Sequence, residues 1–68
     1  MISILLNGER TQIDKSTTII QLLHGLNLAE KRLAVEINQE IIPRSEFEMY
    51  SLSAEDKVEI VQAIGGGC

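Results

Sequence analysis

The chain has 68 residues, which is enough for one domain. Ten Asp and Glu residues against six Lys and Arg residues give a net charge of −4, which argues against nucleic acid as a partner because basic side chains hold phosphate backbones. A single cysteine excludes an internal disulfide. The N-terminus has neither a basic leader nor an apolar stretch long enough to span a bilayer, so we expect a cytoplasmic protein with no membrane partner.

The beginning of the chain predicts a β-hairpin. The first strand has one apolar face formed by alternate residues: Ile2, Ile4 and Leu6. Asn7 and Gly8 follow, and this pair tolerates the positive φ angles that a tight turn requires. We expect the return strand at residues 11–14, with Ile13 facing inward.

A short helix is predicted next. Thr18 and Gln21 have the spacing of a capping box, in which each side chain bonds a backbone N–H of the other residue. One buried stripe follows at helical spacing: Ile19, Leu22, Leu23 and Leu26. Gly25 can adopt the left-handed conformation that ends helices, so we expect the helix to stop there.

The rest of the chain predicts two further strands separated by an irregular stretch. Residues 33–37 form the first of these strands, and Pro43 confines the stretch after it to a sheet edge or an irregular path. The last strand is predicted from "DKVEIVQAI", residues 56–64. Its inward residues are Val58 and Ile60, and its outward residues are Glu59, Val61 and Ala63.

This order of elements predicts an α+β protein in which one helix packs on one face of a mixed sheet. The helical crossover would place the last strand beside the first and parallel to it. That arrangement is the β-grasp, or ubiquitin-like, fold. We expect one domain at residues 1–64 and a flexible, glycine-rich tail at residues 65–68.

No catalytic constellation is present, so we do not expect an enzyme, a metal site or a bound cofactor. His24 is the single histidine and is expected to lie exposed at the end of the helix, where a cation compensates the helix dipole. The carboxylate pairs Glu46/Glu48 and Glu55/Asp56 are expected to be solvated loop charge.

The sequence "VQAIGGGC" holds the remaining chemical feature. A terminal glycine carboxylate has no Cβ, so it can pass through a narrow channel and offer an unhindered carbonyl to a nucleophile. A frayed end or a linker would explain the three glycines equally well.

Four segments resemble the ThiS family, the sulfur carriers of bacterial thiamine biosynthesis, and they extend over nearly the whole chain: "ILLNGE", "TIIQLL", "VEINQEIIPRSEF" and "VEIVQAIGGG". The resemblance implies that an ATP-dependent, ubiquitin-activator-like adenylyltransferase (ThiF type) adenylates the terminal glycine. Sulfur from a cysteine desulfurase route then replaces AMP and leaves a thiocarboxylate. A thiazole synthase (ThiG type) takes this sulfur into the thiazole ring.

The resemblance also assigns roles to single residues. The acyl carrier would be Gly67, and the tail that enters partner channels would be Ile64, Gly65 and Gly66. We expect Val61 and Ala63, which face outward on the last strand, to form an apolar docking patch with Ile64. Glu59 would lie at the rim of this patch.

Cys68 departs from the family pattern, because it gives Gly67 an amide where the chemistry needs a free carboxylate. Three explanations are open. A C-terminal peptidase could remove Cys68, the residue could be an engineered addition, or its thiol could itself carry a persulfide or form a thioester with Gly67.

Other functions are compatible with the same residues. The carrier could serve cysteine, methionine or molybdopterin synthesis after removal of Cys68. It could also be a protein modifier joined to lysines through Gly67, or a redox protein that depends on Cys68.

Overall fold

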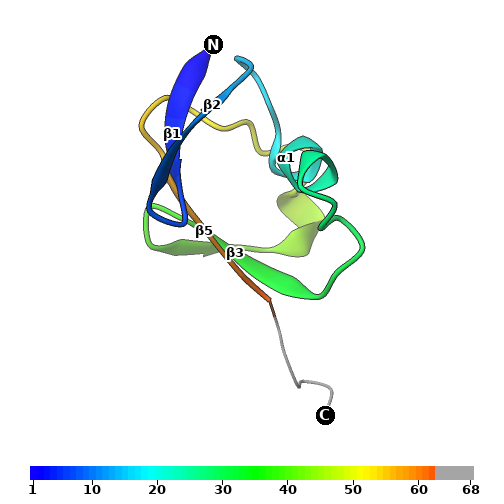
Figure 1. Ribbon diagram of the computed structural model, residues 1–68. Helices are drawn as coiled ribbons and strands as arrows, with labels where there is room; N and C mark the ends of the chain where they lie inside the picture. The colour runs from blue at the N-terminus through cyan, green and yellow to red at the C-terminus, as the bar shows by residue number, and fades with distance from the viewer. Residues whose placement is uncertain (63–68) are drawn as a thin grey trace.

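The computed structural model describes residues 1–62 and contains one mixed sheet and one α-helix (Figure 1). The elements in chain order are β1 (Ile2–Leu6), β2 (Glu9–Ile13), α1 (Ile19–Gly25), β3 (Leu33–Ile37), β4 (Glu40–Ile42), a 3₁₀ turn η1 (Arg44–Glu46) and β5 (Lys57–Gln62). The strand order is β2-β1-β5-β3-β4. The pairing of β1 with β5 is parallel and the other pairings are antiparallel, which confirms the predicted α+β arrangement.

The predicted hairpin is present, with φ angles of 49° at Asn7 and 85° at Gly8. Leu6 pairs with Glu9 directly across this two-residue turn. Pairing therefore resumes at once, and β2 starts two residues earlier than the sequence suggested.

The predicted capping box of α1 is confirmed. Gln21 N donates to Thr18 Oγ1 at 3.3 Å, and Thr18 N donates to Gln21 Oε1 at 3.0 Å. Two further backbone donors of the first turn meet the stretch after η1, since Ile19 N donates to the carbonyl of Tyr50 and Ile20 N to that of Phe47. The start of the helix is therefore tied to a segment far along the chain.

The end of α1 differs from the prediction in two details. Leu26 is 40% exposed, because the helix ends at Gly25 and Leu26 lies beyond its last turn; its assignment to the buried stripe was wrong. The left-handed residue is Asn27, with φ of 61°, rather than Gly25. Asn shares with Gly a tolerance of this conformation.

The core lies between α1 and the sheet and is mainly aliphatic. Its fully buried side chains are Ile4, Ile19, Leu23, Val35, Ile37, Phe47 and Val58. Phe47 comes from the stretch after Pro43. The strand β4, which was not predicted, ends just before that proline, and its place at the edge of the sheet agrees with the path expected there. No helix among residues 1–62 is both long enough and apolar enough to cross a membrane.

Candidate functional site

The central strand β5 leads directly to the residues for which the sequence predicts the chemistry. Val58 is fully buried and Ile60 packs against the core, whereas Glu59 and Val61 are exposed on the opposite face. This alternation is the one predicted from the sequence. We call the sheet face opposite α1 the outer face.

Four residues of β3 and β5 form the centre of the outer face. Ala34 pairs with Val61 and Glu36 pairs with Glu59, so each pair stands side by side across the two strands. Val61 is 58% exposed and Ala34 is also exposed. The result is a small apolar area next to two glutamates at paired positions of neighbouring strands.

Ile41 extends this surface onto the edge strand β4. It pairs with Glu36 and is 68% exposed, which is unusual for an isoleucine. The docking patch predicted from the sequence lacks Ala34, Glu36 and Ile41. Alternation along residues 33–37 could have placed Ala34 and Glu36 on the outer face, but their neighbours depend on the register between strands.

Asn38 and Asp56 fix the first residue of β5. Asn38 N donates to the Lys57 carbonyl at 2.8 Å, and Lys57 N donates back to Asn38 Oδ1 at 3.0 Å. Asn38 Nδ2 and Ser53 N both donate to the Asp56 carboxylate, at 3.1 and 2.8 Å. Asp56 is 9% exposed, so the prediction that it is solvated loop charge was wrong, whereas its neighbour Glu55 is exposed.

Asn7 anchors the same strand further along. Its backbone N–H donates to the Val58 carbonyl at 2.8 Å, and its side-chain Oδ1 accepts from Ile60 N at 2.9 Å. A turn residue of the first hairpin therefore holds β5 at two places. Both anchors set the position and direction of β5 before it reaches residue 62.

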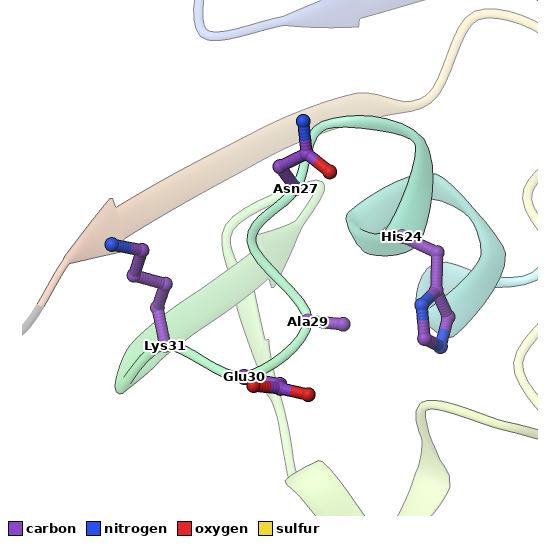
Figure 2. Close-up of a pocket in the computed structure, with 5 residues that line it drawn as sticks. All are labelled: His24, Asn27, Ala29, Glu30 and Lys31. Carbon is purple, nitrogen blue, oxygen red and sulfur yellow. The ribbon is translucent and has the colours of Figure 1, made fainter.

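Polar side chains also line a shallow groove at the end of α1, and this lining includes His24, Asn27, Glu30 and Lys31. Figure 2 shows that these side chains do not converge, because Lys31 and Asn27 point away from the His24 ring. His24 is exposed in the last turn of α1, as predicted. Among residues 1–62, no group of three or more His, Cys, Asp or Glu side chains could hold a metal ion.

Tyr50 is half-buried beside the start of α1. Burial raises the pKa of its phenol, and the carboxylates of Asp56, Glu40 and Glu46 raise it further. The phenol therefore stays protonated at neutral pH and is not available as a base there.

The structure thus places two of the predicted site residues, Glu59 and Val61, and confirms that they share an exposed face. The others lie outside the described residues: Ala63, Ile64, Gly65, Gly66, Gly67 and Cys68. The expected boundary between the domain and its tail, after residue 64, lies outside them as well.

Comparison with known proteins gives a consistent result. The chain is 39% identical over 64 residues to a thiazole synthase of Paramagnetospirillum magneticum; the match covers 94% of this chain but 20% of that protein, so the chain spans about a fifth of its length. It is 40% identical over 63 residues to the sulfur carrier protein ThiS of Bacillus subtilis, covering 91% of this chain and 96% of the relative.

A solved structure supports the fold as well. The crystal structure of the thiamine biosynthesis protein ThiS from Geobacter metallireducens superposes with a TM-score of 0.83 at 29% identity, over 97% of this chain and all of that one (100%). This similarity confirms the predicted β-grasp fold. The model of the ThiS family matches residues 4–67. The chain therefore belongs to the ThiS family.

Proposed function

We propose that this protein is a sulfur carrier of thiamine biosynthesis that works through a thiocarboxylate on Gly67. The observation that carries the proposal is the extent of the family match, which runs through the glycines to residue 67 and leaves Cys68 outside. The protein is a carrier rather than an enzyme: it supplies the acyl group and a docking surface, and its partners supply the catalysis.

The proposed chemistry has three steps on the terminal glycine. The Gly67 carboxylate attacks the α-phosphate of ATP in a ThiF-type adenylyltransferase and releases pyrophosphate. A persulfide sulfur from the cysteine desulfurase route then attacks the acyl carbon, and AMP leaves. Cleavage of the sulfur–sulfur bond by a second thiol leaves the thiocarboxylate, from which a ThiG-type thiazole synthase takes the sulfur.

Glycines suit this chemistry at residues 65–67. A residue without Cβ lets the chain pass close to a partner's backbone and leaves the acyl carbon open to attack. The similarity of this chain to a fifth of a thiazole synthase supports an enzyme of that class as the sulfur acceptor.

The intact mass of the protein isolated from its own host tests the proposal. We expect a species that ends at Gly67, together with a form heavier by the difference between sulfur and oxygen. The free carboxylate requires removal of Cys68 by a peptidase, so trimming and sulfur loading should appear in the same spectrum. If cells that make thiamine contain only the full-length chain, the proposed route through Gly67 is wrong.

A second candidate keeps the same chemistry and changes the acceptor to cysteine, methionine or molybdopterin synthesis. The extra residue after Gly67 favours this alternative, since such a carrier would need trimming before use. Co-purification separates the two, because the first predicts a thiazole synthase as the tight partner and the second does not.

We propose the outer face as the docking surface for the adenylyltransferase. Val61, Ala34 and Ile41 supply exposed apolar area next to Glu36 and Glu59. Like charges directly opposite each other on neighbouring strands are unfavourable. Basic side chains on a partner would relieve this repulsion and would also speed the encounter.

Val61→Asp is expected to weaken binding to the adenylyltransferase about fivefold or more without unfolding the domain. The new carboxylate would be desolvated in the complex and would stand beside Glu59. Titration calorimetry measures the affinity, and circular dichroism checks the fold. Met49→Asp is the matched control, since Met49 is 84% exposed and lies outside the sheet. Equal affinities for the two variants would dismiss the docking surface.

A further inference from the structure

The last half of β5 has a neighbour on one side only among residues 1–62. On the β3 side, pairing continues to the end of the strand, where Gln62 pairs with Leu33. On the β1 side, pairing ends with Leu6 and Val58. In Figure 1, β5 runs beyond the turn between β1 and β2 and keeps β3 beside it. A stretch of open sheet edge therefore lies in the middle of the sheet.

Hydrogen bonds show which backbone groups face this open side. The carbonyls of Asp56 and Val58 accept from Leu5 N at 2.9 Å and from Asn7 N at 2.8 Å. The backbone groups of the even-numbered residues of β5 therefore point toward β1. The Lys57 carbonyl accepts from Asn38 N, so the backbone groups of the odd-numbered residues point toward β3. Because backbone groups of a strand point alternately to its two sides, the N–H and C=O groups of Ile60 and Gln62 face the open side.

Asn7 meets the first of these groups. Its side-chain Oδ1 accepts from Ile60 N. The side chain thus takes the place that a backbone carbonyl would occupy if β1 continued past Leu6. The Ile60 carbonyl and the N–H and carbonyl of Gln62 remain without a partner among the described residues. Three backbone groups in strand geometry are thus left available immediately before residue 63.

We propose that the adenylyltransferase adds an extended segment of its own chain as a strand along this edge of β5. Rows of unpaired backbone N–H and C=O groups are a template for an added strand, and β-addition of this kind is a common mode of recognition. The occupant is an extended backbone because the available groups are backbone groups at the spacing of a strand. This inference rests on the proposed function, which requires a partner to receive the residues that follow β5.

The added strand has a consequence for the proposed reaction. Backbone pairing that starts at Ile60 and Gln62 fixes the direction of the chain at residue 62, just before the residues for which we propose the chemistry. The partner thereby orients the acyl group through the main chain, and it does so next to the outer face that carries Val61. The side chains of the outer face and the backbone groups of the open edge would together form one continuous contact surface for the adenylyltransferase.

The variant Gln62→Pro isolates the contribution of the backbone to binding. Gln62→Pro removes an N–H that does not belong to the pairing with β3, and Gln62→Ala keeps that N–H while it removes the same side chain. We expect Gln62→Pro to bind the adenylyltransferase of the host about tenfold more weakly than Gln62→Ala, because a carbonyl of the partner is left unpaired. Equal affinities of the two variants would overturn the added strand.

Hydrogen exchange of the wild-type complex provides a second test, which does not depend on how Gln62→Pro folds. The amide of Gln62 should exchange quickly in the free protein and slowly in the complex. Fast exchange in both states would contradict the proposal. If the wild-type chain forms a dimer and Gln62→Pro is a monomer, the edge binds a second copy of this chain. That result would overturn the assignment of the edge to the enzyme.

The two proposals fail in different ways. If the wild-type chain becomes a thiocarboxylate but Gln62→Pro and Gln62→Ala bind equally, the added strand alone is wrong. If the wild-type chain neither binds the adenylyltransferase nor acquires sulfur, the proposed function is wrong, and the added strand falls with it.

Discussion

A chain shortened by both Gly67 and Cys68 is expected to fold normally and to transfer no sulfur. The core described among residues 1–62 has Ile60 as its last member, and the deletion leaves all of these residues in place. It removes the carbonyl that is adenylated, and the preceding glycine would end one residue short of the reacting centre. Thermal unfolding tests the fold, and the mass of the product after incubation with ATP, sulfide donor and partner enzymes tests the transfer.

Deletion of Cys68 alone is the matched control. This chain should accept sulfur without any peptidase, since Gly67 then carries a free carboxylate. Sulfur transfer by the chain that lacks both residues would remove Gly67 from the mechanism. Loss of transfer on deletion of Cys68 alone would instead assign the sulfur to its thiol.

Leu22→Ala is expected to lower the free energy of unfolding by about 2–5 kcal/mol. Leu22 is 8% exposed and lies on the buried face of α1, so truncation leaves a cavity under the helix. A domain of this length buries only about 60% of the surface of its unfolded chain, and its total stability is correspondingly small. The loss should therefore be visible as a large shift in the urea unfolding midpoint.

Leu26→Ala provides the comparison, because it makes the same change four residues later at a side chain that is 40% exposed. We expect it to cost less than about 1 kcal/mol. A loss below about 1 kcal/mol for Leu22→Ala would mean that α1 does not pack as described. Equal and large losses at both leucines would mean that the helix continues past Gly25.

Local signals in the sequence predicted most of the fold. Residues 33–37 form a strand with the predicted bounds, Asn7 and Gly8 make the predicted turn, and the capping box at Thr18 starts the helix. Each of these features depends on residues close together in the chain. The same holds for the alternation of Glu59 and Val61 with the buried residues of β5.

Two of the differences came from contacts between distant segments, and the one at Leu26 came from the local end of the helix. Asp56 lies in an acidic stretch that looks solvated, but Asn38, which is 18 residues away in the chain, bonds its carboxylate and helps to bury it. The outer face includes Ala34 and Ile41 only because of the register between β3, β4 and β5. Leu26 continued a helical pattern that the chain itself does not continue, since the helix ends one residue earlier.

The central place of β5 also affects the order in which the protein can fold during synthesis. The ribosome releases both hairpins and α1 before residues 57–62, yet β1 and β3 are not neighbours in the sheet and are joined into it only by β5. Isolated two-stranded hairpins are marginally stable in water. A chain whose translation stops before β5 would therefore stay unfolded and exposed to proteases. Only chains translated through β5 could present a folded domain to the partner enzymes.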